Sequence, residues 1–218
     1  MRIFIGYDGS ESSDAVLEDL KRAGLPRNSE VRVATVGELL MSSPQVKEVA
    51  AQEITSWRLG AALKQAETHA DRVIREAEDL SEKAADSISL LFPEWDVTSE
   101  VITGTPAWEL IDAAERWNAD LVVVGSRGRS AISRLLLGSV SRTVVTDSQR
   151  SVRVARPVER KNEKSPPHII IGIDGSQAAK EAVLAVGRRV WQDGTHVRLV
   201  AAHDRPSPAG IAARLPRT

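Results

Sequence analysis

The chain has 218 residues, of which 42% are hydrophobic and 4% aromatic, so it can form one or two domains with a mainly aliphatic core. Its formal net charge of −1 and its lack of a long apolar run disfavour binding to nucleic acid or to a membrane. It has no cysteine for a disulfide or a thiolate, and a strand pattern begins without a signal peptide. We therefore expect a cytoplasmic protein.

The first elements of the chain predict a strand–helix–strand unit. An apolar run from Arg2 to Tyr7 stops at Asp8-Gly9-Ser10, where a serine can cap the following helix. A second strand is expected over 31–36. Asp8 occupies a strand end, where side chains of parallel sheets often face a ligand, although an ordinary turn aspartate is the favoured interpretation when the motif is taken alone.

A long amphipathic helix is expected from Ser56 to about Leu90, after a loop in which 46–54 could form a helical turn or two. Its apolar positions alternate by four and three residues; they are Leu59, Leu63, Ala66, Ala70, Val73, Ala77, Leu80 and Ala84. This spacing suits either a coiled-coil seam or a stripe that covers a sheet. We favour the sheet-covering stripe, and nothing in it suggests a ligand.

The next segment predicts a third strand and another helix. Residues 95–102 alternate between apolar and polar side chains, as in a strand near a sheet edge. Thr105 is the expected N-cap of the following helix, with Pro106 in its first turn. A helix is then expected over Ser139 to about Thr146, and a fifth strand over 151–155.

Two glycine clusters follow the apolar strand Leu121–Gly125. The first is Gly125-Ser126-Arg127-Gly128, and after nine residues comes Gly138-Ser139-Val140-Ser141. Glycine lets backbone N–H groups approach an anion, the hydroxyls of both serines in the second cluster can donate hydrogen bonds, and Arg127 and Arg129 add positive charge. A helix that begins near the second cluster would point its dipole at the same place. The pattern predicts a phosphate-binding cradle, with a plain strand–loop–helix connection as the alternative.

Residues 1–156 resemble the universal stress protein family. The resemblance rests on the spacing of the glycine clusters and on four segments, which are residues 3–10, 104–106, 119–128 and 135–141. It implies an α/β fold with a doubly wound, Rossmann-like parallel sheet of five strands in the order 3-2-1-4-5. It also implies that ATP, or the related ADP or AMP, binds between strands 1 and 4. Winding reverses between those strands, where a ligand site is expected on physical grounds.

The resemblance also implies the residues of the nucleotide site. They are Asp8, Val36, Gly125, Arg127, Gly128, Gly138, Ser139, Val140 and Ser141. Asp8 would face the ribose and adenine, and Val36 would border the adenine, although a valine that ends a strand is usually a core residue. Mg²⁺ can accompany a triphosphate, but no carboxylate pair marks a dedicated metal site.

We expect a nucleotide-binding regulator of the stress response rather than a catalyst. The chain lacks the Walker pattern, and none of its four histidines falls in a motif, so no catalytic residue is predicted. A weak ATPase on the same scaffold and a nucleotide-free interaction protein are the alternatives.

An internal repeat begins after a proline-bearing linker over 157–167. Residues 168–176 repeat residues 2–10 at an offset of 166, and 168–204 would form one βαβ unit of an incomplete second domain, before a tail over 205–218. That unit has no glycine cradle, so Asp174 is expected to be a turn residue. It could dock on the first domain, pair with a second chain or be mobile.

A homodimer is expected, because members of the resembled family commonly pair through the fifth strand. Here that edge is Ser151–Ala155, and Arg153 within it could either prevent pairing or simply face solvent.

Overall fold

The computed structural model describes residues 1–38, 56–128, 137–157 and 165–202, excepting the side chains of 56–63. The chain divides into two compact units, Met1–Glu163 and Lys164–Thr218, which are described separately below. The expectations for 46–54, for Arg129, for most of the linker and for the tail lie outside the described residues.

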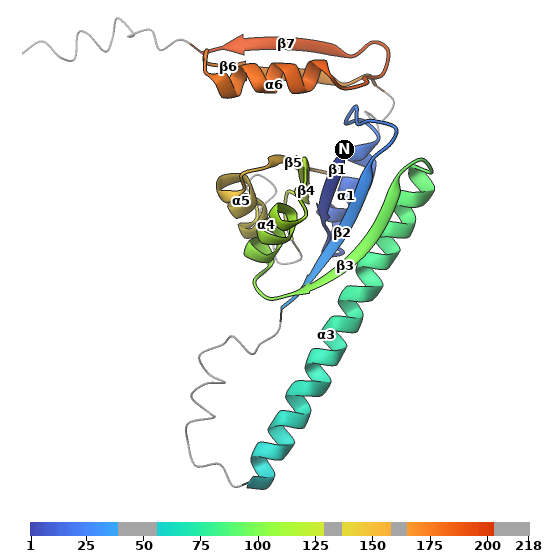
Figure 1. The fold of residues 1–218 in the computed structure, drawn as a ribbon, viewed down its shortest axis with the longest axis vertical. Helices are drawn as coiled ribbons and strands as arrows, with labels where there is room; N and C mark the ends of the chain where they lie inside the picture. The colour runs from blue at the N-terminus through green and yellow to red at the C-terminus, as the bar shows by residue number, and fades with distance from the viewer. Residues whose placement is uncertain (39–55, 129–136, 158–164, 203–218) are drawn as a thin grey trace, which may run out of the picture. The chain divides into compact units, whose positions relative to one another are not determined.

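The first unit contains a parallel sheet of five strands in the order β3-β2-β1-β4-β5, as predicted (Figure 1). Its strands are β1 (Arg2–Gly6), β2 (Glu30–Gly37), β3 (Asp96–Thr103), β4 (Leu121–Gly125) and β5 (Ser151–Ala155). Strand β1 pairs with β2 from Arg2↔Glu30 and with β4 from Ile3↔Leu121. The chain therefore winds in opposite directions on the two sides of β1, and the edge position expected for β3 is confirmed.

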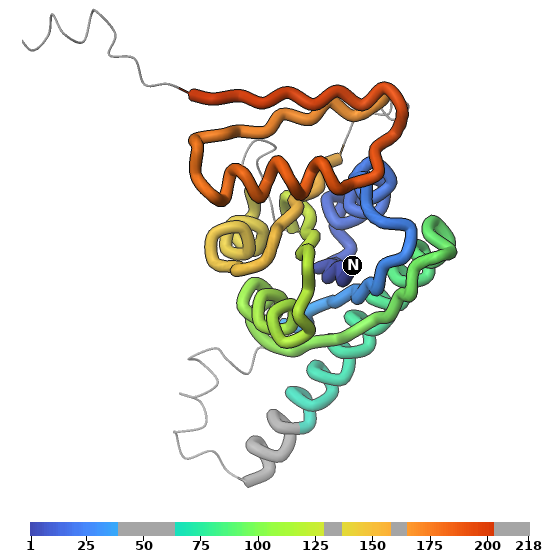
Figure 2. Tube along the Cα trace, turned by 45° about the horizontal axis from the view of Figure 1, so that its top comes forward, coloured from blue at the N-terminus to red at the C-terminus, as the bar shows by residue number. Residues whose placement is uncertain are grey.

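Helices cover both faces of this sheet (Figures 1 and 2). They are α1 (Glu11–Leu20), α3 (Ser56–Leu91), α4 (Pro106–Arg116) and α5 (Ser139–Asp147). Side chains of α1 and α3 pack in the core of one face, and side chains of α4 and α5 pack in the core of the other. The inner strands β1 and β4 are buried on both sides, which is why they read as apolar runs without alternation, whereas the edge strand β3 has no buried residue.

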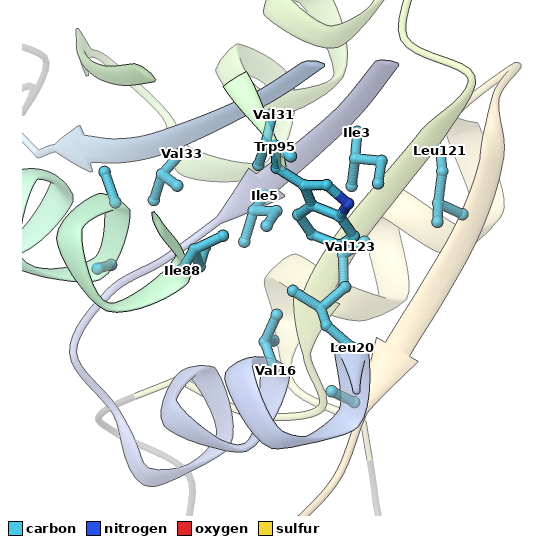
Figure 3. Packing of buried hydrophobic residues seen from close by; sticks show 13 residues of the cluster. Ile3, Ile5, Val16, Leu20, Val31, Val33, Ile88, Trp95, Leu121 and Val123 are labelled. Atoms are coloured by element: carbon cyan, nitrogen blue, oxygen red, sulfur yellow. The ribbon is translucent and has the colours of Figure 1, made fainter. Parts of the chain in front are cut away.

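The core beneath α1 and α3 is aliphatic, apart from Trp95 (Figure 3). Strand residues such as Ile3, Ile5 and Val123 meet Val16 of α1 there. On the opposite face, Phe4 joins a second cluster with residues of α4 and α5. Neighbouring residues of β1 thus enter different cores, as the period of two in a strand requires.

Helix α3 covers the sheet with the C-terminal half of its stripe. Ala77, Ala84 and Ile88 are buried, whereas the described side chains over 64–72 are exposed or half-buried. At 36 residues, the helix is about 54 Å long. It extends well past the ends of β2 and β3 (Figure 1). The sheet-covering interpretation is therefore confirmed for the part of the stripe that reaches the strands.

Two helices begin directly after N-cap residues that the sequence predicts. Ser10 is the N-cap of α1, and its hydroxyl accepts a hydrogen bond from the Ser13 amide at 3.2 Å. Thr105 is the N-cap residue of α4 and Pro106 follows it, but the Thr105 side chain makes no capping bond. The proline alone, with its fixed φ, therefore favours the start of α4.

The second unit contains β6 (His168–Ile173), α6 (Gln177–Gly187) and β7 (His196–Ala201). The two strands are parallel, with His168 opposite His196 in the register, just as Arg2 lies opposite Glu30 in the first unit. Figure 2 shows α6 lying alongside both strands. A βαβ unit thus forms where the sequence repeat predicts one; that it represents an incomplete second domain stays a prediction.

Candidate functional site

A cavity of about 800 Å³ opens at the carboxyl ends of β1, β2 and β4. Parallel sheets of this winding place their ligand sites at this point, because the loops after neighbouring strands diverge there. All nine residues of the predicted site line the cavity: Asp8, Val36, Gly125, Arg127, Gly128, Gly138, Ser139, Val140 and Ser141. The structure therefore brings together segments that are more than a hundred residues apart in the sequence.

Asp8 and Gly128 lie next to each other in the lining of the cavity. One carboxylate oxygen of Asp8 accepts a hydrogen bond from the Ser10 amide at 3.0 Å, which fixes the orientation of the side chain after β1. A Cβ added to Gly128 would lie 3.0 Å from the other oxygen, Oδ2. Any larger side chain at position 128 would therefore compete with a ligand for the space beside Asp8.

The two glycine clusters are in direct contact. The Gly138 amide donates a hydrogen bond to the Ser126 carbonyl at 2.8 Å. A Cβ on Gly138 would approach the Cα of Arg127 to 3.2 Å, which is tighter than ordinary van der Waals contact. The turn after β4 and the start of α5 thus form one continuous wall of the cavity.

The N-terminus of α5 contributes backbone amides to this wall. Gly138 is the N-cap, so Ser139, Val140 and Ser141 occupy the first helical turn, whose N–H groups lack partners within the helix. The helix dipole adds partial positive charge at the same end. With the guanidinium of Arg127 among the lining residues, this wall can bind an anion.

The hydroxyl of Ser141 is not available in the way that the sequence suggested. The side chain is buried and donates hydrogen bonds to the Ser126 carbonyl at 3.0 Å and to the Gly138 carbonyl at 3.1 Å. Its hydroxyl links the two glycine clusters instead of facing a ligand. Ser139, in contrast, is exposed on the wall.

Sequence reasoning missed the serines that attach α1 to the turn after β4. The Ser10 hydroxyl donates to the Arg127 carbonyl at 3.1 Å, and the hydroxyls of Ser12 and Ser126 lie 3.5 Å apart. Gly125 makes this approach possible, because a Cβ there would come within 2.7 Å of the Ser12 backbone. The three closely spaced serines after Asp8-Gly9 were the available signal, but they were interpreted only as helix caps.

Helix α3 forms a second wall of the cavity, although nothing in its apolar stripe suggests a ligand from the sequence. Four of its residues line the cavity, namely Val73, Glu76, Ala77 and Leu80. The helix comes close to the strand ends because glycines stand there. A Cβ on Gly37 would lie 3.0 Å from Val73, and one on Gly9 would lie 2.8 Å from Leu80. The apolar stripe therefore lines the cavity through Val73, Ala77 and Leu80, which its sequence did not indicate.

Tyr7 contributes a polar aromatic side chain to the cavity, where it donates a hydrogen bond to the Asp14 carboxylate. Burial of the phenol raises its pKa well above the usual range, and the hydrogen bond and negative charge of Asp14 raise the pKa further. The phenol therefore remains protonated, and keeps donating, throughout the neutral pH range.

The charges that line the cavity are mixed. Asp8, Glu38 and Glu76 are acidic, and Arg127 is the basic residue among the described lining side chains. The described part of the chain contains no group of three or more His, Cys, Asp or Glu side chains arranged to hold a metal ion. Within the same residues, none of the helices has the length and apolarity needed to cross a bilayer.

Comparisons with known proteins point to one family. The model of the universal stress protein family matches residues 1–156. The universal stress protein Rv1996 of Mycobacterium tuberculosis is 28% identical over 213 residues, which cover 88% of this chain and 63% of that protein. The universal stress protein MJ0531 of Methanocaldococcus jannaschii is 34% identical over 77 residues, or 34% of this chain and 45% of that protein. The chain thus spans less than two thirds of the length of either relative.

A solved structure shares the same fold. The universal stress protein UspA from Lactobacillus plantarum superposes with a TM-score of 0.55 and 19% sequence identity, over 72% of this chain and 97% of that protein.

Proposed function

Because the chain belongs to the universal stress protein family, we propose that residues 1–156 bind ATP, or the related ADP or AMP, and act as a nucleotide-dependent regulator in stress response. The observation that carries the proposal is the contact between the two glycine clusters beside Asp8, at the point where the winding of the sheet reverses. This arrangement offers amides, a helix N-terminus and a carboxylate to one ligand.

Each part of the cavity suits a different part of a nucleotide. The phosphates fit the wall formed by Gly128, Arg127 and the first turn of α5, which presents N–H groups and positive charge. The Asp8 carboxylate can accept hydrogen bonds from ribose hydroxyls. The base fits between Val36 and the apolar side chains of α3, because a planar ring gains most from burial against such surfaces.

Regulation is favoured over catalysis. The chain lacks the Walker pattern, and the described lining residues include no histidine, lysine or cysteine, so an ATPase would have to use the carboxylate of Asp8, Glu38 or Glu76 as its base. Mg²⁺ is proposed only as a companion of a triphosphate, since the described side chains form no metal site of their own. Slow ATP hydrolysis, and an interaction protein that binds no nucleotide, are the competing functions.

The nucleotide proposal is tested by mass spectrometry of the ligand released from purified, heat-denatured protein. We expect an adenine nucleotide in an amount that approaches one molecule per chain. Its presence would exclude a nucleotide-free interaction protein. If no nucleotide is released, and none binds on titration, the proposal is wrong.

Phosphate release over time distinguishes the regulator from the ATPase. We expect release from ATP to stay at the level of a protein-free control over hours. A rate that scales with protein concentration and disappears in a Gly128 variant with a bulky side chain would identify an ATPase instead.

The proposal includes a cytoplasmic homodimer, and the structure bears on where the two chains meet. Arg153 of β5 neither faces open solvent nor projects from the edge, because its guanidinium makes a paired interaction with the Asp19 carboxylate of α1. Arg153 Nη2 donates a hydrogen bond to Asp19 Oδ1 at 2.8 Å. The Asp19 carboxylate compensates the charge of Arg153, so this arginine does not by itself oppose pairing through β5.

A further inference from the structure

Among the described residues of the second unit, the strands carry the apolar side chains of a complete sheet without the cover that the first unit gives to its own. Ile170, Val197 and Leu199 stand 166 positions after Phe4, Val31 and Val33. The earlier three side chains are 0%, 1% and 0% exposed, and the later three are 70%, 50% and 51% exposed. Apolar side chains are therefore exposed on both faces of the small sheet, at positions whose counterparts in the first unit are fully buried.

One edge of the small sheet is also unpartnered. In the first unit β1 has β2 on one side and β4 on the other. Its counterpart β6 pairs only with β7, so the other side of β6 carries backbone N–H and C=O groups with no strand beside them in the described part of the chain. Such an edge readily pairs with another chain.

Charge distinguishes this edge from the other sheet edges among the described residues. Strand β3 carries Glu100, β5 carries Arg153 and β7 carries Arg198. Charged side chains are the usual protection of an edge strand against pairing. Strand β6, with the sequence HIIIGI, contains no Asp, Glu, Lys or Arg. It is the edge that lacks this protection.

We propose that β6 pairs with β6 of a second copy of the chain, forming a four-stranded sheet in the order β7-β6-β6′-β7′. A closed pair of identical edges requires a two-fold axis, and an axis perpendicular to the sheet makes the two central strands antiparallel. Both α6 helices then lie on the same face. A second copy suits this edge because the six residues of β6 meet a strand of the same apolar, uncharged character.

The symmetry restricts the register. Directly opposed residues of antiparallel strands point to the same face, and alternate residues point to opposite faces. Each residue of β6 must therefore oppose a residue of the same parity in the partner strand. The residue on the axis then opposes its own copy. Centring the overlap on β6 places either Ile170 or Ile171 on the axis, but not both.

Single cysteines test this geometry, since the chain has none of its own. Ile170→Cys and Ile171→Cys are oxidised separately, with Arg198→Cys on the opposite edge as the control. Directly opposed Cβ atoms lie about 4.5–5.5 Å apart, near the reach of a disulfide. We expect one of the two β6 variants to form a covalent dimer readily, and the control to stay monomeric under denaturing electrophoresis. Failure of both β6 variants, or equal cross-linking of the control, would overturn the proposal.

Sedimentation of the full chain gives a second test without cross-linking. Ile170→Lys places one added charge from each copy on the axis or within one residue of it, and since the Ile170 side chain is 70% exposed the substitution removes no core contact. We expect the dimer dissociation constant to rise by about tenfold or more. Val200→Lys, on the neighbouring strand and 42% exposed, is the matched control and should change it little. A monomeric wild type, or a dimer insensitive to Ile170→Lys, contradicts pairing through β6.

Discussion

At the scale of single residues, the three glycines of the two clusters are glycine for two different reasons. At Gly125 the backbone of Ser12 leaves no room for a Cβ, and at Gly138 the backbone of Arg127 is nearly as close. At Gly128 the close neighbour among the described residues is the carboxylate of Asp8, which lines the same cavity. The first two glycines therefore serve packing, and the third keeps the proposed site open.

This difference predicts a large loss of stability for one of two identical substitutions and almost none for the other. Gly125→Ala pushes a methyl group against the backbone of Ser12 and Ser13, at 2.7–2.8 Å, and should destabilise the first unit by about 1–3 kcal/mol. Gly128→Ala meets only a movable carboxylate oxygen and should change stability by less than about 0.5 kcal/mol. Urea denaturation of the two variants measures both values, and equal losses would refute the assignment.

The sequence was a good guide to which residues line the cavity and a poor guide to what their side chains do. The nine residues are those that the family resemblance implies, and they meet because the strand order places the ends of β1 and β4 side by side. The hydroxyl of Ser141 depends instead on the carbonyl of Ser126, fifteen residues away, which local pattern does not specify. The joining of Ser10 to Arg127 depends on tertiary packing in the same way.

At the scale of secondary structure, α3 is the element whose role changes most between sequence and structure. Its stripe predicted a helix that covers a sheet, and Ala77, Ala84 and Ile88 do so. The same stripe also reaches the cavity through Val73 and Leu80. Periodicity identifies the buried face of a helix, but where that helix crosses the strand ends depends on glycines in other elements, here Gly9 and Gly37.

Two leucine-sized side chains near the end of α3 test which face covers the sheet. Ile88 is 0% exposed, so Ile88→Ala should lower the free energy of unfolding by about 2–5 kcal/mol, through lost burial and a residual cavity. Leu90 is 83% exposed, and Leu90→Ala should change it by less than about 0.5 kcal/mol. Thermal or urea denaturation compares the two; a large loss for Leu90→Ala would mean that the helix is rotated.

At the scale of the whole molecule, strand order could be predicted while assembly could not. Apolar strands alternating with helices, together with the resemblance, gave the order β3-β2-β1-β4-β5, which is confirmed. The internal repeat predicted the βαβ unit over 168–204, and a βαβ unit forms there. Its exposed apolar positions are visible only in three dimensions, because the sequence resembles that of the buried strands in the first unit.

The most direct test of the central claim is an equilibrium titration with ATP, ADP and AMP of the wild type, Gly128→Ala and Gly128→Leu. A leucine at position 128 projects into the space beside Asp8, so we expect the dissociation constant to rise by about tenfold or more, with an unchanged circular dichroism spectrum and melting midpoint. Gly128→Ala should have a smaller effect. Wild-type affinity in folded Gly128→Leu would show that the nucleotide does not bind between the glycine clusters and Asp8.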